Sequence, residues 1–312
     1  MGASKNEHVA KAVLRAAESV CSEGQQGKVS KKGDLQTPGL ILPLGLVALE
    51  IALVKRVWGK EYETMDNAFA TCSYVYPLVT SVLYLSLITV GQALMKNREP
   101  MHDFCKPCMV VYNLYQTVFN TWWVVMVIVE VARLGYPPFT LPLTLKSDQY
   151  NLGFLIWLHY QNKYLEMFDT VFMVMRKKTN QVSFLHCYHH LLLLWAWFVV
   201  CRFGCGGEAY FGALMNSIIH VLMYGYYFLS TLAIPVPWKK YLTKLQMLQF
   251  AVCLVHTLVC SYINLYPRVL AAVEVWVMVN MLYLFNEFYK RAYAAKKAKQ
   301  KAAAVASSKK EQ

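Results

Sequence analysis

Three histidines stand within five residues in the segment QVSFLHCYHH, residues 181–190, at the start of an otherwise apolar stretch. A neutral imidazole is a nucleophile, a general base or a metal ligand, and it is costly to hold in hydrocarbon unless something uses it. On a helix, His186 shares a stripe with His189 or with His190, whereas the latter two diverge by about 100°. The spacing therefore indicates a site for acyl transfer or for metal chemistry.

Metal binding is the first alternative. Membrane oxygenases and desaturases spread their iron ligands over several histidine-rich boxes, because each iron needs several imidazoles. This chain has eight histidines but a single box, and His159, His220 and His256 stand alone. One ion held by the triplet stays an alternative, although His189 and His190 cannot easily share it. We expect no metal, and we interpret His256 as a core residue.

Acyl transfer is the second alternative and the favoured one. Imidazole has a pKa of about 6.5, so its neutral form is present at cytosolic pH as a nucleophile or general base. If His189 and His220 lie on facing helices, they can divide these two roles, with Asn and Tyr donors around a developing oxyanion.

The segment KYLEMFDT places charged residues in another apolar run. Lys163, Glu166 and Thr170 follow i, i+3 and i+7 spacing. Asp169 comes three residues after Glu166, so we expect one shared helix face. Charges are costly within a membrane, so this face should point into the protein and pair. A buried ion pair that fixes helix packing and a direct catalytic role are equally favoured.

Two later segments, NSIIHVLMYGYY and TKLQMLQF, add polar side chains at helical spacing. The first forms a stripe near the middle of its span, and the second has two glutamines within two turns of its start. Four helices thus bring uncommon polar groups to one half of a bundle, which predicts a site open to the cytosol. The added residues are Asn216, His220, Met223, Tyr224, Tyr227, Gln246 and Gln249.

The elements that must position these residues are membrane helices. Of 312 residues, 57% are hydrophobic and the mean hydropathy is +0.32, which is typical of a multi-span membrane protein. A bilayer core of about 30 Å needs about 20 apolar residues per helix. Residues 38–54 are a shorter run that spans, re-enters or lies in the interface. The segments long enough to span are residues 69–95, 107–131, 151–175, 183–202, 209–233, 241–265 and 270–289.

Basic residues alternate between the loops, as the positive-inside rule predicts. They concentrate after the first, third and last spans and around the start of the sixth, so we expect these ends and the carboxyl tail in the cytosol. The net charge of +13 then reflects topology, and nucleic-acid binding is not needed to explain it. The basic residues are Lys96, Arg98, Lys106, Arg176, Lys177, Lys178, Lys239, Lys240, Lys244, Lys290, Arg291 and Lys296.

The rest of the chain divides by composition. Residues 1–37 are a polar tail that does not resemble a secretory signal, and residues 38–58 form the membrane-associated or extra spanning segment. Residues 294–312 are a basic low-complexity tail. Its end, KKEQ at 309–312, resembles the dilysine retrieval signal of endoplasmic reticulum membrane proteins. Nine cysteines form no regular framework, and the CKPC pair at 105–108 is assigned no role.

The set KYLEMFDT, QVSFLHCYHH, HVLMYGYYFLS and TKLQMLQF, in this order and at these intervals, resembles the ELO family of fatty-acid elongases. The resemblance covers residues 69–293. It implies a 3-ketoacyl-CoA synthase of the endoplasmic reticulum membrane with seven spans, six of them around a narrow acyl tunnel closed at the lumenal end. The implied reaction condenses a long-chain acyl-CoA with malonyl-CoA and releases CO2 and CoA, with no cofactor and no metal.

The resemblance also implies roles for the residues above. His189 takes the acyl group as an acyl-imidazole, and His220 assists that transfer or the decarboxylation of malonyl-CoA. The basic rim at Arg176, Lys177 and Lys178 suits CoA phosphates, or reflects topology alone. Residues that orient the site or shape its polar wall are His186, His190, Lys163, Glu166 and Asp169. Residues that contact the CoA arm, the carbonyls or the substrate are Asn216, Tyr224, Gln246 and Gln249.

The substrate class follows from a finer resemblance. Gln181 and the run GGEAYFGALMNSIIHVLMYGYYFLS resemble the polyunsaturated-substrate branch of the family, so we expect C18 or C20 polyunsaturated acyl-CoAs, with saturated or monounsaturated chains as the alternative. A steric wall should set chain length, because about 0.8 kcal/mol per methylene cannot set a sharp limit. Implied partners are membrane lipid, the ketoacyl reductase, dehydratase and enoyl reductase of the cycle, and a second copy of the chain. A seven-span receptor or transporter and a membrane iron oxygenase are the competing classes.

Overall fold

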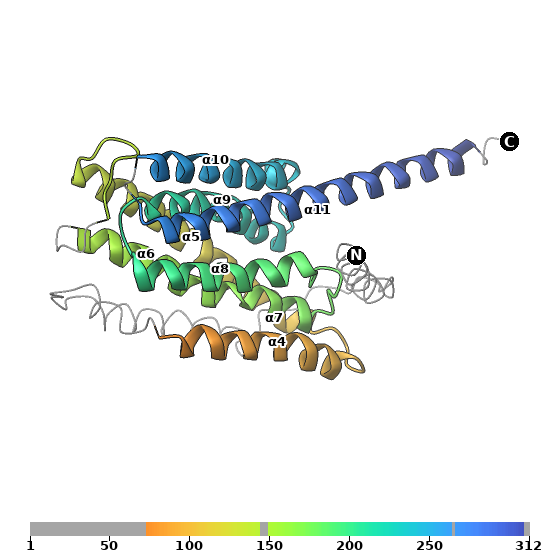
Figure 1. Cartoon of the computed structure of the whole chain (residues 1–312). Coiled ribbons are helices and arrows are strands. Elements are labelled where there is room, and N and C mark those ends of the chain that lie inside the picture. Colours follow the sequence, from red (N-terminus) through yellow and green to blue (C-terminus); the bar gives the residue numbers. More distant parts are fainter. Residues whose placement is uncertain (1–72, 144–148, 264–265, 309–312) are drawn as a thin grey trace, which may run out of the picture.

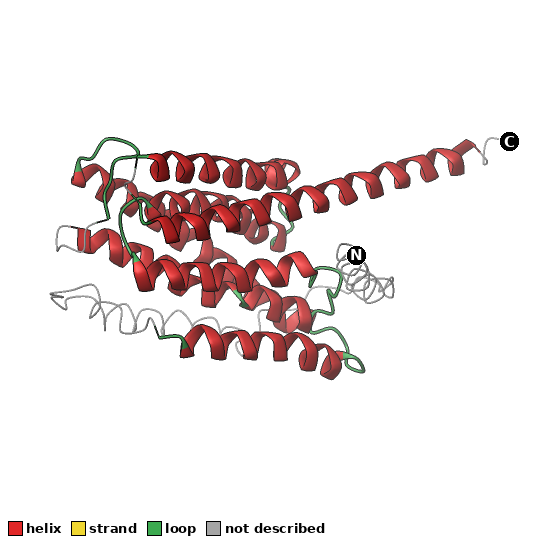
Figure 2. Cartoon of the chain, in the orientation of Figure 1, coloured by secondary structure: helices red, strands yellow, loops and turns green. Residues whose placement is uncertain are grey.

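The computed structural model describes residues 73–143, 149–263 and 266–308. The amino-terminal tail, the 38–58 segment and the KKEQ end lie outside these residues. Every regular element in the described part is a helix (Figure 2). Along the chain (Figure 1) they are α4 Val75–Met95, α5 His102–Leu134, α6 Tyr150–Glu166, α7 Phe168–Met175, α8 Phe184–Phe203, α9 Ala209–Thr231, η2 Pro237–Tyr241, α10 Leu242–Tyr262 and α11 Arg268–Ser308.

Five described helices are long and apolar enough to cross a membrane: α4, α5, α8, η2 joined to α10, and the first part of α11. The two remaining expected spans correspond to α6 with α7 and to α9. The former is interrupted at Met167, and the latter includes Asn216, Ser217 and His220 among its apolar residues. The prediction of an all-α polytopic membrane protein is confirmed, whereas the count of seven spans stays a prediction.

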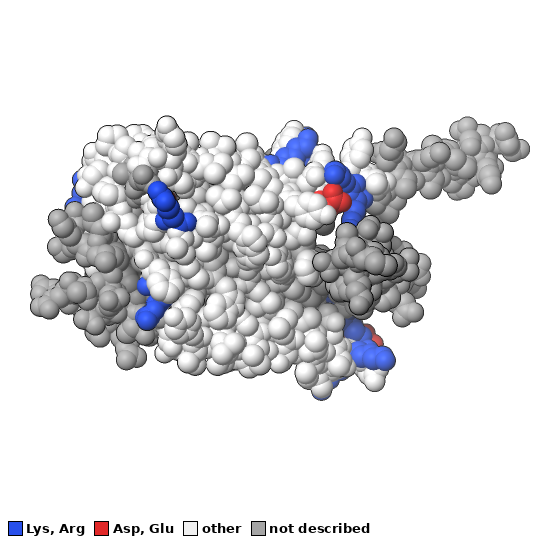
Figure 3. All heavy atoms as spheres, in the orientation of Figure 1, with Lys and Arg blue, Asp and Glu red and all other residues white. Residues whose placement is uncertain are grey.

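The surface supports a membrane setting. Large apolar side chains point outward, including Val82 and Leu83 of α4, which are 57% and 63% exposed. On the face drawn in Figure 3, Lys and Arg side chains lie toward the two ends of the body, and uncharged side chains fill the band between them. Apolar surface of this extent is stable when lipid covers it.

The helices form a ring in which each neighbour contacts the next. Helix α5 packs along α9, α9 on α10, α10 on α11, α11 on α8, α8 on α6, and α6 on α5, while α4 lies against α7 and α8. Helix α6 is buried along most of its length. Burial from several sides suits a helix that carries Lys163 and Glu166, because charged groups must be kept from lipid.

Local signals set the start of α8 and the turn after it. The Ser183 hydroxyl accepts a hydrogen bond from the backbone N–H of His186 (3.3 Å) and caps the helix. The triplet therefore occupies the first two turns of α8. At the other end, Gly207 has φ +54°, and a Cβ there would lie 2.9 Å from backbone atoms of Leu143, so a glycine is needed.

Helix α11 runs further than the apolar pattern predicts. It continues past residue 289, the expected end of the last span, to Ser308 and projects from the body (Figure 1). Alanine and lysine, which dominate this extension, are strong helix formers, so the low-complexity composition is compatible with helix. The start of the low-complexity tail is thus part of the same helix as the last span.

Candidate active site

A buried polar cluster joins the end of α6 to the middle of α9. The Lys163 ammonium donates to Glu166 Oε1 (2.7 Å) and to Asn216 Oδ1 (2.8 Å). His220 Nδ1 lies 3.1 Å from the same Glu166 oxygen. All four residues are at least nine-tenths buried. The structure therefore pairs Lys163 with Glu166 as the sequence spacing predicted, and adds Asn216 and His220.

The three histidine rings of α8 lie close to one another but contact different parts of the protein. His186 Nε2 lies 2.7 Å from Thr170 Oγ1, which in turn lies 2.8 Å from the Tyr84 hydroxyl. The His190 ring lies against His186, with 4.5 Å between ring centroids. His189 is half-buried. His186 thus pairs with His190 across one helical turn, and the His190 ring also lies 5.4 Å from the His189 ring between centroids.

His189 belongs with the α6–α9 cluster. Its ring approaches Phe285 of α11, with 6.4 Å between centroids, and it interacts electrostatically with Glu166, Lys163, His220 and His186. Adjacent residues on a helix point about 100° apart, so His189 can contact α11 while His190 packs against His186. The structure brings His189 and His220 into one electrostatic neighbourhood, with Lys163 and Glu166 between their helices.

The polar residues of KYLEMFDT point into the protein, as expected, but they take different partners. The Tyr224 hydroxyl donates to Asp169 Oδ2 (2.8 Å), and Thr170 lies against His186, whereas Glu166 turns to Lys163. Met167, between Glu166 and Asp169, is the residue at which α6 ends and α7 begins. Asp169 lies in a tyrosine-lined neighbourhood next to the Glu166 cluster, because the Tyr224 ring also packs against His220, with 5.5 Å between centroids.

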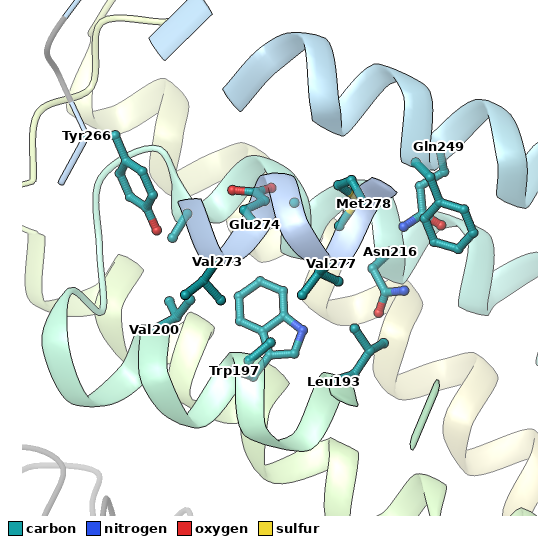
Figure 4. Close-up of a pocket in the computed structure, with 14 residues that line it drawn as sticks. Leu193, Trp197, Val200, Asn216, Gln249, Tyr266, Val273, Glu274, Val277 and Met278 are labelled. Atoms are coloured by element: carbon teal, nitrogen blue, oxygen red, sulfur yellow. The ribbon is translucent and has the colours of Figure 1, made fainter. Parts of the chain in front are cut away.

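A pocket between α8, α9, α10 and α11 reaches this cluster (Figure 4). Its lining is mostly apolar, and Trp197 is its largest side chain. Asn216 and Gln249 lie at one end, and Tyr266 and Glu274 lie toward the other. Asn216 also accepts from Lys163, so one residue belongs to both the pocket and the polar cluster. An apolar slot that ends at titratable groups can place the end of an alkyl chain beside a reactive imidazole.

Other predicted residues lie in different surroundings. Gln249 is buried in the pocket lining, and Gln246 is half-buried one turn earlier on α10. Tyr224 is fully buried against Asp169 and does not line the pocket. Gln181 is exposed in the loop before α8. The structure thus brings Gln249, but not Gln181 or Tyr224, to the pocket wall.

The basic rim is partly engaged with the protein itself. The Lys177 ammonium donates to the backbone carbonyls of Lys96 and Arg98, at 3.0 and 2.8 Å. The Arg176 guanidinium lies 3.1 Å from the sulfur of Met109. The Lys177 contacts tie the loop after α4 to the loop after α7, and the Arg176 contact ties the end of α7 to α5. Arg176 and Lys177 therefore help to hold this end of the bundle together, in addition to any role in substrate binding.

Sequence reasoning missed a polar stripe on α5. Asn113, Gln116 and Asn120 are buried, and Gln116 Oε1 accepts from Asn162 of α6 (2.9 Å). The spacing i, i+3, i+7 in the segment NLYQTVFN was the signal that could have found them. The pocket residue Glu274 was also missed, because a lone acidic residue near the start of a span has no local pattern to mark it.

A second polar cluster lies at the opposite end of the bundle, where α9 begins. Glu208 Oε1 accepts from the backbone N–H of Leu141 (2.8 Å), and Glu208 Oε2 lies 3.0 Å from His256 Nε2. The His256 ring stacks on Phe211 at 3.9 Å. Cys260 brings its sulfur to 3.7 Å from His256 Nε2. The contacts fasten a loop to α9 and α10, so we assign these residues a structural role, in line with the interpretation of His256 as a core residue.

Comparison with known proteins places the chain in a family. The family model described as ELO, GNS1/SUR4 family, matches residues 69–301. Very long chain fatty acid elongase 5 of Bos taurus is 34% identical over 77% of this chain and 82% of its own length. Very long chain fatty acid elongase 4 of Homo sapiens is 31% identical over 82% of this chain and 84% of its own length. The match covers the four motifs, the polar cluster and the pocket. The chain therefore belongs to the ELO (GNS1/SUR4) family of fatty-acid elongases and is a condensing enzyme.

Proposed function

We propose that the chain condenses polyunsaturated C18 or C20 acyl-CoA with malonyl-CoA through an acyl-enzyme on His189. The observation that carries the mechanism is the double position of Asn216, which lines the apolar pocket and accepts from Lys163 of the histidine-bearing cluster. A hydrocarbon chain bound in the pocket then ends beside the groups that do chemistry. Saturated or monounsaturated acyl-CoAs are the alternative substrates.

Acylation is the first half-reaction. The neutral imidazole of His189 attacks the thioester carbonyl, the C–S bond breaks, and CoA leaves as a thiolate. The acyl-imidazolium loses its ring N–H proton, and that proton converts the thiolate to CoA-SH. His220 is the group that handles this proton. CoA departs before malonyl-CoA enters, which gives ping-pong kinetics.

Condensation is the second half-reaction. The bond from malonyl C2 to its carboxylate breaks and releases CO2, and the electron pair left on C2 attacks the acyl carbonyl carbon. The C–N bond to His189 then breaks, and the departing imidazole takes up one proton from solvent. The net change consumes acyl-CoA, malonyl-CoA and one proton, and yields 3-ketoacyl-CoA, CoA and CO2. Asn216 and Gln249, at the pocket end nearest the cluster, are the polar groups placed to hold the carbonyl oxygens.

The cellular setting is part of the proposal. The domain of residues 69–293 lies in the endoplasmic reticulum membrane, with the histidine triplet and the carboxyl terminus on the cytosolic side. A 3-ketoacyl product must be reduced, dehydrated and reduced again to become a saturated extension. A ketoacyl reductase, a dehydratase and an enoyl reductase of the same membrane therefore act next, and the enzyme works as a homodimer.

The test uses detergent-purified protein, a panel of acyl-CoAs that differ in length and unsaturation, and labelled malonyl-CoA. We expect 3-ketoacyl product, with polyunsaturated C18 and C20 chains preferred. His189→Ala and His220→Ala should each lower kcat by at least about 100-fold. With acyl-CoA alone, wild type should release one equivalent of CoA and hold the acyl group on His189, as peptide mass spectrometry would show.

The matched control is His102→Ala, which removes an exposed histidine at the start of α5 and should leave kcat unchanged. A metal chelator should also leave turnover unchanged, whereas iron-dependent activity would indicate an oxygenase. Folded protein that binds acyl-CoA and never releases CoA would indicate a receptor or transporter. Equal turnover of saturated chains would retain the elongase and remove the polyunsaturated preference.

A further inference from the structure

A chain of side-chain amides connects α5 to the buried carboxylate of α6. Asn120 Nδ2 lies 3.3 Å from Gln116 Oε1, and Asn162 Nδ2 donates to the same oxygen at 2.9 Å. Asn162 Nδ2 also lies 3.2 Å from Glu166 Oε1. The three amide residues are fully buried. Gln116 is therefore the acceptor that holds Asn162, and Asn162 is the group that reaches Glu166.

The contacts converge on one oxygen atom. Glu166 Oε1 is approached by Lys163 Nζ at 2.7 Å, by His220 Nδ1 at 3.1 Å and by Asn162 Nδ2 at 3.2 Å. Three nitrogen atoms so close to one oxygen restrict where that oxygen can lie. Its position sets which nitrogen of His220 faces the carboxylate, and so which nitrogen is left for proton transfer.

We propose that Gln116 is a positioning residue for the reaction, acting through Asn162 to hold Glu166 where it orients His220. The inference rests on the proposed function, in which His220 handles the proton of each half-reaction. Gln116 lies on α5, away from the residues that line the pocket. It therefore acts on the rate of the chemical step and not on the binding of the acyl chain.

The decisive variant is Gln116→Met, which keeps the length of the side chain and removes both polar atoms. We expect kcat to fall by about 10- to 100-fold, as small misplacements of catalytic groups do, with KM for both CoA substrates within about twofold of wild type. A uniform structural defect would change KM and the melting temperature together. Gln116→Asn, which keeps the amide but is one methylene too short to reach Asn162, should lose kcat in the same way.

A double-mutant cycle tests the route through Asn162. If Gln116 acts through Asn162, then Gln116→Met combined with Asn162→Leu should lower kcat no further than Asn162→Leu alone. The matched control is Thr117→Val on the same helix. The Thr117 hydroxyl donates only to the backbone carbonyl of Asn113 (2.7 Å), so kcat should stay at the wild-type value.

The outcomes separate this inference from the proposed function. Unchanged kcat in both Gln116→Met and Gln116→Asn, with His220→Ala inactive, overturns the role of Gln116 and leaves the function intact. Multiplicative losses in the double mutant overturn the route through Asn162. An active His220→Ala overturns the proposed function first. Selective loss of kcat with a non-additive cycle supports the inference.

Discussion

Two buried carboxylates, Glu166 and Glu208, each lie against a histidine, yet their surroundings differ. Both oxygens of Glu208 are used, one by the backbone N–H of Leu141 and one by His256. Neither Glu208 nor His256 has a buried side-chain atom without a partner among the described residues. The contacts around Glu166 converge instead on a single oxygen, which Lys163 Nζ, Asn162 Nδ2 and His220 Nδ1 all approach.

The difference suggests how to separate structural from catalytic polar groups within one membrane protein. A structural cluster is most stable when every polar atom is satisfied, because each unsatisfied atom in a buried site is costly. Catalytic groups must change partners during turnover, and their hydrogen bonds are often long or poorly aligned before substrate binds. The Glu208 cluster fits the first description and the Glu166 cluster fits the second.

The largest expected effect comes from Glu166→Gln. It leaves the Lys163 charge buried without its partner, which costs about 3 to 5 kcal/mol of stability, and we expect kcat to fall by more than about 100-fold. Adding Lys163→Met should restore much of the unfolding temperature in detergent but none of the activity. If the double mutant recovered activity as well as stability, the Lys163–Glu166 pair would be structural. The Glu166 and Glu208 clusters would then have the same role.

A smaller, purely structural effect is expected from Glu208→Gln. The amide keeps the size of the side chain but cannot accept at both ends, so one contact to Leu141 or His256 is lost. Stability should fall by about 1 to 3 kcal/mol, seen as a lower unfolding temperature. Turnover per folded molecule should match wild type in the same preparation. A drop in kcat at unchanged stability would mean that the Glu208 cluster takes part in the reaction.

The smallest effect on activity is expected from Gly212→Ala, in the pocket that lies between the Glu166 and Glu208 clusters. A Cβ at Gly212 would lie 2.8 Å from Glu274 Oε1, so Gly212→Ala should narrow the pocket by displacing that carboxyl. Discrimination between chains that differ by one methylene is worth about 1 to 3 kcal/mol in an apolar site. We expect the acyl-CoA preference to move to shorter chains, with little change in kcat for the best substrate. An unchanged length profile would show that this part of the pocket does not hold the chain.

The membrane helices could be predicted from the sequence for two reasons. A segment within lipid must satisfy its own backbone hydrogen bonds, which a helix does, and its side chains must be apolar over the length of the span. The Lys163–Glu166 pair was predictable for a related reason: neighbouring positions on one helix follow from spacing alone. The histidine triplet was equally visible, since polar residues at the start of an apolar span stand out. Each of these features is local, because it depends only on residues within one helix.

Features that join different helices depended on tertiary structure. Spacing left open whether His186 pairs with His189 or His190, and only the packing of α8 placed the His186 ring against His190 and the His189 ring near Phe285 of α11. Tertiary packing also gave Asp169 and Glu166 different partners, Tyr224 and Lys163, on the two sides of the junction between α6 and α7.

The amino-acid sequence was sufficient to show that this chain is a helical membrane protein with a histidine-bearing polar site. It was sufficient because the cost of placing each side chain in lipid depends on the type of that residue alone. Which imidazole joins the carboxylate, which amides hold that carboxylate, and where the apolar pocket meets them were decided by the tertiary structure. The physical reason is that these contacts are made between helices distant in sequence, and their geometry depends on how the whole ring packs.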